Sequence, residues 1–176
     1  MTIALIDSDI LVYRIGFTTQ DVNEAIACSR MDESIDGILE AIQCTEYKSF
    51  LTSQEKNNFR YEIYPEYKAT RISPKPIHYQ ILRDHLILSH NAIIAEGIEA
   101  DDLLGIEQTT DTIIVSIDKG LDQIPGMHYN FVKGIKYTIT PAEGKYKFYL
   151  QLLQGDQVDN IPGIFGIGPK KAEKIL

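Results

Sequence analysis

The chain has 176 residues with a formal net charge of −8, and 44% of its residues are hydrophobic. This predicts one domain with a hydrophobic core, spanning residues 1–176. No apolar run reaches the ~20 residues of a membrane span, and Asp7 and Asp9 interrupt the first one, so a secretory signal is not expected either. Cys28 and Cys44 fall in one predicted helix, ~24 Å apart, which is too far for a disulfide. We therefore expect a cytoplasmic protein.

The negative charge is unevenly distributed along the chain. Residues 1–130 hold 10 Lys and Arg against 21 Asp and Glu, whereas residues 131–176 hold 7 against 4. This balance argues against a broad, nonspecific DNA-binding surface. It does not exclude DNA as a partner, because bound divalent cations would offset part of the acidic half.

Apolar periodicity predicts strands that alternate with helices. Strands are expected at residues 2–6, 47–52, 92–95 and 112–117, with a hairpin at 131–139. Helices are expected at residues 10–15, 22–44, 77–90 and 141–153, with one more beginning near residue 99. A break of the second helix near Met31 is left open. The alternation indicates an α/β domain with a mainly parallel sheet flanked by helices.

Carboxylates stand at the ends of the predicted strands and at the beginning of a helix. Capping explains part of the acidic run at residues 99–102, but three acids within four residues exceed what a cap needs. We expect seven carboxylates from four segments near one rim of the sheet: Asp7, Glu99, Asp101, Asp102, Asp118, Asp156 and Asp159. They would repel one another unless cations lie between them, and ligation by oxygen alone selects Mg²⁺ or Mn²⁺.

Residues 155–171, GDQVDNIPGIFGIGPKK, join two of these acids to a glycine-rich run. Glycines let the backbone turn sharply and approach a ligand, and a proline suits the first turn of a helix. Free N–H groups at that helix start, with lysines behind them, favour a phosphate. The residues concerned are Gly163, Gly166, Gly168, Pro169, Lys170 and Lys171. A capped helix after a glycine loop is the simpler alternative, but the neighbouring cation and phosphate sites together suggest a nuclease.

Aromatic and basic residues alternate over residues 59–71, which include Tyr67, Lys68 and Arg71. Such a run suits single-stranded nucleic acid through base stacking and phosphate contacts, and an aromatic edge of the core explains it equally well. The four histidines show no metal-ligand spacing and are interpreted as core or surface residues: His78, His85, His90 and His128.

Five blocks spread over the chain carry a family resemblance: LIDSDILVYR, YPEYKATR, GIEADDLLG, VSIDKGLDQIPG and GDQVDNIPGIFGIGPKKAEKIL. In this order they resemble the 5′→3′ exonuclease and flap endonuclease family, especially its small bacteriophage members. They are also similar to the N-terminal nuclease domain of bacterial DNA polymerase I. The resemblance implies a PIN-like α/β fold that ends, over residues 155–176, in a partial helix–hairpin–helix motif that binds DNA.

The resemblance also implies hydrolysis of DNA phosphodiesters by two Mg²⁺ or Mn²⁺ ions. The first ion would be held by Asp7, Glu99, Asp101 and Asp102. The second would be held by Asp118, Asp156 and Asp159. Lys68 and Arg71 would be catalytic and contact the scissile phosphate. DNA binding would involve Tyr67, Gly163, Gly166, Gly168, Lys170 and Lys171.

Other partners follow from the same resemblance. K⁺ is a further candidate ion at the hairpin. The expected substrate is DNA with 5′ ends, flaps or nicks, and an RNA–DNA hybrid is a further candidate. The chain is expected to be a monomer, in an infected bacterial host if it is phage-encoded.

Three departures from the family pattern stand out. Gly120 occupies the place of a metal-binding Asp after Asp118-Lys119, and no aspartate precedes Phe59-Arg60 within residues 51–54. The chain also ends early in the second helix of the hairpin motif, as in a short phage version or a fragment. We therefore expect the second ion to bind weakly and activity to be reduced.

Two alternatives remain open. One is a catalytically inactive relative that binds DNA structures, which the missing acids favour and the seven remaining carboxylates oppose. The other is a phosphatase of the haloacid dehalogenase type, with Asp7-Ser8-Asp9 and Lys119 as its motif residues. That motif normally has Thr or Val where this chain has Leu11, and it leaves the glycine-rich run unexplained.

Overall fold

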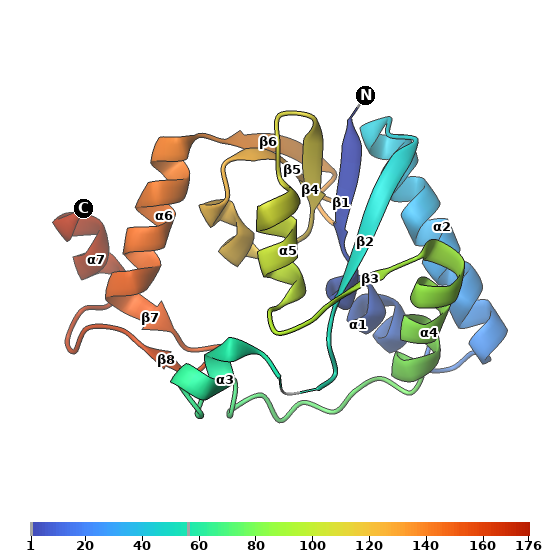
Figure 1. The fold of residues 1–176 in the computed structure, drawn as a ribbon, viewed down its shortest axis with the longest axis horizontal. Coiled ribbons are helices and arrows are strands. Elements are labelled where there is room, and N and C mark those ends of the chain that lie inside the picture. Colours follow the sequence, from blue (N-terminus) through green and yellow to red (C-terminus); the bar gives the residue numbers. More distant parts are fainter. Residues whose placement is uncertain (1, 56) are drawn as a thin grey trace.

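The computed structural model describes residues 2–55 and 57–176, and a six-stranded sheet forms its centre (Figure 1). Its strands are β1 (Ile3–Asp7), β2 (Glu46–Thr52), β3 (Ile93–Ala95), β4 (Thr112–Val115), β5 (Gly126–Asn130) and β6 (Ile135–Ile139). Their order is β3-β2-β1-β4-β5-β6, and every neighbouring pair is parallel except β5 and β6. The predicted α/β class with a mainly parallel sheet is confirmed.

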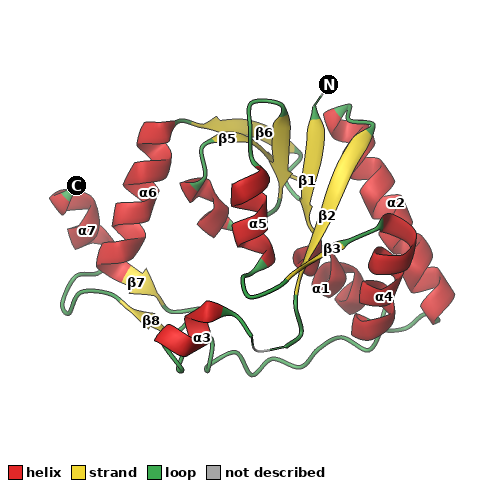
Figure 2. Cartoon of the chain, viewed as in Figure 1, coloured by secondary structure: helices red, strands yellow, loops and turns green. Residues whose placement is uncertain are grey.

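Helices and short elements complete the described chain (Figure 2). The helices are α1 (Ser8–Thr18), α2 (Glu24–Ile42), α3 (Phe59–Ile63), α4 (Tyr79–His90), α5 (Ala100–Glu107), the 3₁₀ helix η1 (Lys119–Gln123), α6 (Pro141–Gln154) and α7 (Pro169–Ile175). Strands β7 (Gly155–Asp156) and β8 (Ile161–Pro162) form a separate antiparallel pair. Within residues 2–55 and 57–176, none of the helices combines the length and apolar composition that crossing a membrane requires.

The structure decides one point that the sequence left open and corrects two expectations. Helix α2 continues through Met31. The side chain of Met31 is fully buried in the core, and this packing stabilises the helix at that position. Cys44 lies beyond the end of α2, so the two free cysteines do not share a helix. The hairpin starts at Gly126 because β5 pairs with β4 on one side and with β6 on the other.

Side chains of β1 alternate between two hydrophobic layers. Ala4 and Ile6 belong to the larger cluster, which contains buried residues of α1, α2 and α4. Leu5 belongs to the smaller cluster with residues of α5 and η1. All three side chains are fully buried. The period of two along a strand therefore explains why helices cover both faces of the sheet.

The strand order reverses between β1 and β4. From β1 the chain first adds β2 and β3 on one side, and then returns to place β4 on the other side of β1. Ile6 of β1 lies beside Val115 of β4, so the carboxyl ends of the two strands are level. Ligands of open parallel sheets bind outside the carboxyl ends at such a reversal. The fold thus directs Asp7 and the segment after β4 toward one place.

Helix α6 follows the antiparallel edge of the sheet and packs on η1 and α7 (Figure 1). Thr140 caps its start, since its hydroxyl accepts from the Glu143 N–H at 3.2 Å, while the Glu143 carboxylate accepts from the Thr140 N–H at 2.8 Å. Gly144 is buried where α6 meets the backbone of Gln123. This contact fixes the distance between α6 and η1.

We predict that Gly144→Ala destabilises the fold although alanine favours a helix. A Cβ at position 144 would lie 2.7 Å from the backbone oxygen of Gln123, which is part of η1 and cannot rotate away. The expected loss is about 1–3 kcal/mol in the free energy of unfolding, measured by urea denaturation. Gly37→Ala in α2 is the matched control, because nothing lies within 4 Å of its Cβ position. It should gain up to about 1 kcal/mol, and an equal gain in both variants would contradict the packing argument.

Candidate active site

Asp7 lies at the end of β1 and is 2% exposed. The Ser116 hydroxyl donates to its Oδ2 at 2.7 Å, and the Ile10 N–H donates to its Oδ1 at 3.4 Å. Burial, and then the charge of Asp101, hold the pKa of Asp7 well above its usual range. Ser116 also accepts a hydrogen bond from the Asp118 N–H at 3.0 Å. Ser116 was not among the residues selected from the sequence. Its position directly after β4 and two residues before Asp118 places it at the same rim of the sheet and could have identified it.

Glu99 precedes α5 and is 8% exposed. Its Oε1 accepts from Lys68 Nζ at 2.6 Å, and its Oε2 accepts from the Tyr67 hydroxyl at 2.9 Å. The same hydroxyl lies 3.0 Å from Oδ2 of Asp159. Burial, followed by the charges of Glu99 and Asp159, raises the pKa of Tyr67. Tyr67 therefore joins two of the predicted metal-binding carboxylates.

Tyr67 and Lys68 are less accessible than the sequence suggested. Tyr67 is 4% exposed and packs its ring against Tyr61, with the centroids 5.5 Å apart. Of the two interpretations that the sequence left open, Tyr67 therefore fits an aromatic edge of the core and not an exposed stacking surface. The Lys68 side chain is 18% exposed because it turns inward to Glu99, whereas the Arg71 side chain is 49% exposed and pairs with Asp159.

Asp101 and Asp102, in the first turn of α5, have different surroundings. Burial, and then the nearby charges of Asp118 and Glu99, raise the pKa of Asp101 to about 7. Asp102 binds Arg60 through both oxygens, at 2.6 and 2.7 Å, and accepts from the Glu99 N–H at 2.9 Å. Burial raises the pKa of Asp102, but the hydrogen bonds from Arg60 and the Glu99 N–H, together with the charges of Arg60 and Lys68, outweigh it and leave the pKa lowered. The structure thus gives Asp102 a cap and an ion pair, and its role as a metal ligand stays a prediction.

The three carboxylates expected to hold the second ion line one pocket of about 390 Å³. Asp118 is exposed and accepts from the Gly120 N–H at 2.7 Å. Asp156 accepts from Gln151 Nε2 at 2.7 Å and from the Asp159 N–H at 3.3 Å. Further lining residues include Arg71, Lys119, Gly120, Gln123, Lys147 and Gln151. The pocket therefore lies between η1, α6 and the turn after β7.

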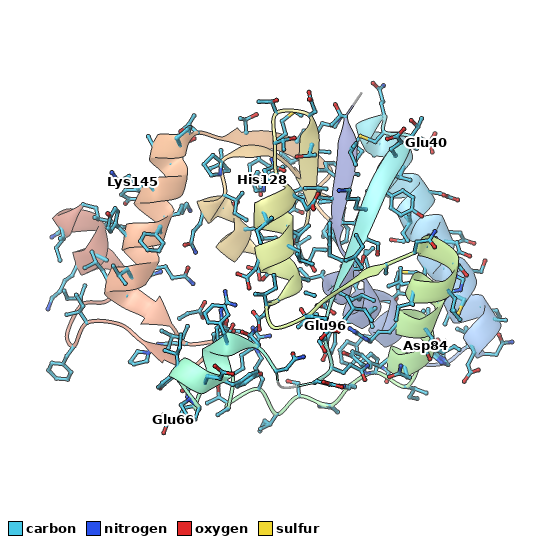
Figure 3. The ribbon with its side chains drawn as sticks, viewed as in Figure 1. Glu40, Glu66, Asp84, Glu96, His128 and Lys145 are labelled. Carbon is cyan, nitrogen blue, oxygen red and sulfur yellow. The ribbon has the colours of Figure 1, made fainter. Side chains whose placement is uncertain are left out.

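Hydrogen bonds join the loop at residues 66–71 to the turn at residues 158–160, although the two segments are about 90 residues apart in the sequence. The Lys68 N–H donates to the Asp159 carbonyl at 2.9 Å, and Asn160 Nδ2 donates to the Glu66 carbonyl at the same distance. Lys68 and Asn160 both have positive φ, of 55° and 58°. The Glu66 side chain itself projects outward from this loop (Figure 3). These bonds hold the two predicted catalytic cations beside the carboxylates.

An ion pair of Asp9 and Arg83 supports the other side of the rim. Arg83 is 3% exposed, and it donates to Asp9 Oδ1 at 2.9 Å and to the Thr52 carbonyl at 2.7 Å. The Thr52 N–H donates to Asp9 Oδ2 at 2.8 Å. Sequence reasoning did not include this pair among the site residues. Arg83 could have been selected from the sequence, because it is a charged residue on the apolar side of the helix predicted at residues 77–90.

The acidic rim has the oxygen donors that a hard divalent cation needs, although these oxygens do not converge on a single position. Among residues 2–55 and 57–176, no three of the seven carboxylates present oxygens that all lie within 4.8 Å of one another. Lys68, Arg71 and Arg60 pair with members of the set. Burial first, and the charges of neighbouring carboxylates second, raise the pKa values of Asp7 and Asp101, and a bound cation would favour the ionised form of both. The donor set therefore fits Mg²⁺ or Mn²⁺.

The glycine-rich segment lies at one end of the molecule, between α6 and α7 (Figure 1). Gly163 approaches the backbone of Gln154 so closely that a Cβ would lie 2.2 Å from its carbonyl carbon. Gly166 has φ of +74°, which favours glycine, and its carbonyl accepts from Lys171 Nζ at 2.8 Å. Gly168 is the residue before α7, and Lys170 is exposed in its first turn.

Together, fold and site define an α/β domain with an acidic rim at the strand reversal of a parallel sheet. The sequence model of the family described as "5'-3' exonuclease, N-terminal resolvase-like domain" matches residues 2–149. The chain belongs to this 5′-3′ exonuclease family, as the sequence motifs indicated. The match decides against the phosphatase alternative.

Individual proteins agree with the family match. A 5′-3′ exonuclease of Buchnera aphidicola subsp. Schizaphis graminum is 32% identical over 200 residues, which cover 99% of this chain and 69% of that protein. DNA polymerase I of Rhizobium leguminosarum is 36% identical over 137 residues, 67% of this chain and 14% of the polymerase. The flap endonuclease of bacteriophage T5, solved as a pseudo-enzyme-product complex with DNA and metal ions, superposes with a TM-score of 0.77. That match has 19% identity and covers 99% of this chain and 74% of the other, so it confirms the expected mainly parallel α/β fold, while the helix–hairpin–helix ending stays a prediction.

We predict that Tyr67→Phe destabilises the protein by about 1–3 kcal/mol, because two buried or half-buried carboxylates lose their shared donor. The ring stays in place, so packing against Tyr61 is preserved. Urea denaturation measures the effect. Tyr64→Phe is the control, since its hydroxyl donates to exposed Glu66 at 3.1 Å, and it should change stability by less than about 0.5 kcal/mol. Equal small effects in both variants would remove Tyr67 from the supporting network.

Proposed function

We propose that this chain is a metal-dependent nuclease that hydrolyses DNA phosphodiesters as a 5′→3′ exonuclease or flap endonuclease. The observation that carries the proposal is the acidic rim at the strand reversal, with Asp7 buried beside Asp101, in a member of the 5′-3′ exonuclease family. The bacteriophage T5 relative was crystallised with DNA and metal ions, which supports both as ligands here.

The ions would be Mg²⁺ or Mn²⁺, at two sites. Asp7, Glu99 and Asp101, with Asp102 as a further candidate, would hold the first. Asp118, Asp156 and Asp159 would hold the second, which we expect to be the weaker site because Gly120 supplies no carboxylate. When bound, such ions lower the pKa of an attacking water and neutralise charge on the reacting phosphate.

The chain's own cations would bind the scissile phosphate. Lys68 and Arg71 now pair with Glu99 and Asp159, and both line a pocket of about 280 Å³ together with Tyr13, Tyr79 and Lys75. A phosphodiester entering this pocket offers oxygens that can replace the carboxylates as partners of the two side chains. Lys68 and Arg71 would then stabilise the charge that develops on the phosphate, while Tyr67 and Arg60 keep Glu99 and Asp102 in position.

We propose further that residues 163–171 bind the duplex backbone as part of a helix–hairpin–helix element over residues 155–176. The loop turns at Gly166, whose carbonyl accepts from the Lys171 amine, and Lys170 is exposed in the first turn of the following helix. K⁺ is a candidate ion at the same loop. Activity on RNA–DNA hybrids, a monomeric state and a bacterial cytoplasmic location belong to the same proposal.

A cleavage assay tests the proposed function. A 5′-labelled flap, a nicked duplex, a blunt duplex and an RNA–DNA hybrid are incubated with Mg²⁺, Mn²⁺ or a chelator. Metal-dependent products that shorten from the 5′ end, or that leave at the flap junction, are expected. Tight binding of the flap without cleavage in any metal would instead identify an inactive binding protein.

We predict that Lys68→Ala lowers kcat by about 100-fold or more, as loss of a charge partner of the transition state does. Because Glu99 would lose its partner at 2.6 Å, the melting temperature should also fall. Lys75→Ala is the comparison variant: its amine lies over the Tyr79 ring, 4.1 Å from the centroid, and its loss should raise KM with little change in kcat. Normal kcat for Lys68→Ala would remove this lysine from the catalytic group.

We predict that Gly120→Asp raises activity and lowers the Mn²⁺ concentration needed for half-maximal rate. A Cβ at position 120 would lie 3.2 Å from Asp118 Oδ1, an exposed side chain that can shift, so the new carboxylate is tolerated beside Asp118. Asp122, the next acid along the chain, already accepts from the Tyr137 hydroxyl at 3.0 Å. Gly120→Asn controls for size without charge. An unchanged metal requirement in Gly120→Asp, with efficient cleavage by the native chain, would refute the missing-ligand argument.

A further inference from the structure

Asp32 of α2 and two histidines of α4 form a polar cluster outside the acidic rim. Asp32 Oδ1 lies 2.5 Å from His85 Nε2 and 2.7 Å from His90 Nε2. The carboxylate and the two imidazoles are the one group of three such side chains, among residues 2–55 and 57–176, whose ligand atoms all lie within 4.8 Å of one another. Helices α2 and α4 contact each other on the same face of the sheet.

We propose that Asp32, His85 and His90 form a Zn²⁺ site that joins α2 to α4. Two imidazole nitrogens and one carboxylate oxygen suit Zn²⁺ better than Mg²⁺, which prefers oxygen ligands. Zinc bonds of 2.0–2.2 Å in a tetrahedral arrangement place neighbouring ligand atoms roughly 3.3 Å apart. The two nitrogens therefore need to move away from Asp32 by less than about 1 Å. Three protein ligands leave a position for water.

The second nitrogen of each ring already has an oxygen partner. His90 Nδ1 lies 2.7 Å from the Tyr47 hydroxyl, and His85 Nδ1 lies 3.3 Å from Ser89 Oγ. Each oxygen can accept from Nδ1–H, which leaves the Nε2 lone pair free for a metal. Histidines that bind metals are commonly oriented in this way by a second hydrogen bond. The outer contacts are thus compatible with the tautomer that a metal site requires.

A purely hydrogen-bonded cluster, in which both Nε2–H groups donate to Asp32, is the competing interpretation. Accessibility permits a metal, because the side chain of Asp32 is 45% exposed while those of His85 and His90 are 19% and 12% exposed. The other two histidines are buried, and the Nε2 atoms of His78 and His128 lie within hydrogen-bond distance of the backbone oxygens of Val22 and Ile124. Zinc that binds through imidazole is therefore expected at His85 and His90 alone.

Calorimetric titration of the chelator-treated full chain with Zn²⁺, in a large excess of Mg²⁺, tests the proposal. The Mg²⁺ competes for sites made of oxygen ligands only, so the acidic rim does not dominate the signal, whether or not the protein is a nuclease. We expect one equivalent of Zn²⁺ to bind. Asp32→Asn and His90→Gln should each weaken binding at least tenfold, and Tyr47→Phe, which keeps all three ligands, about tenfold. His128→Gln is the matched control and should bind as the native chain does.

Nitrogen NMR of the imidazoles gives a second readout that does not depend on the stability of the variants. In the native chain, Zn²⁺ should shift the Nε2 signals of two of the four histidines, and Zn²⁺ should also raise the melting temperature by several degrees. Absence of Zn²⁺ binding, binding unchanged in both Asp32→Asn and His90→Gln, or Nε2 shifts in His78 or His128 instead would overturn the site and leave a hydrogen-bonded clamp.

Discussion

Electrostatic repulsion at the carboxyl ends of β1 and β4 is the constraint that the rest of the structure has to meet. The sheet reverses there, so Asp7 at the end of β1 and Asp118, three residues after β4, come from adjacent strands' carboxyl ends, and the start of α5 adds Glu99 and Asp101. Burial removes the water that would otherwise screen these charges. Burial, and then the charges of neighbouring carboxylates, raise the pKa of Asp101 to about 7 and hold the pKa of Asp7 well above its usual range.

The chain answers this repulsion with cations from a loop that is distant in sequence. Arg60, Lys68 and Arg71 each pair with one carboxylate of the rim, and Tyr67 joins two more oxygens. Backbone bonds to residues 158–160 fix the loop, so the cations are held by structure and not only by charge. Two of these side chains, Lys68 and Arg71, are the ones we propose for binding phosphate. Neutralising the rim and recognising an anionic substrate thus share these two residues.

Much of this arrangement was predictable from the sequence because it depends on local rules. A short apolar run ending in Asp7, and another just before Asp118, identify parallel strands that present acids at one edge. The helix starts at residues 99–102 and 141–143 follow from capping residues. The family motifs added the grouping of the carboxylates, and the match over residues 2–149 agrees with them.

The sequence could not show contacts between residues that are far apart along the chain, because no periodic pattern marks such contacts. For Tyr67 the sequence left base stacking and a place at the edge of the core equally open, since nothing near it reveals that its hydroxyl bonds both Glu99 and Asp159. Nothing near Lys68 reveals that its amine turns inward to Glu99. His85 and His90 have no recognised ligand spacing, and their third partner lies 53 and 58 residues away in α2. Packing of α2 against α4 creates that group, and packing is a property of the folded chain.

Helix α4 connects the two sites that emerge from the structure. Its Arg83 reaches Asp9 and the Thr52 carbonyl beside the acidic rim, while His85 and His90 reach Asp32 on α2. Arg83 is buried, and its partner Asp9 follows Asp7 by two residues. A displacement of α4 would therefore also displace Asp9 and the start of α1. An interaction that fixes α4 to α2 therefore also helps to fix the position of Asp9, two residues from Asp7. A clamp at Asp32 would stabilise the site without touching any of its carboxylates.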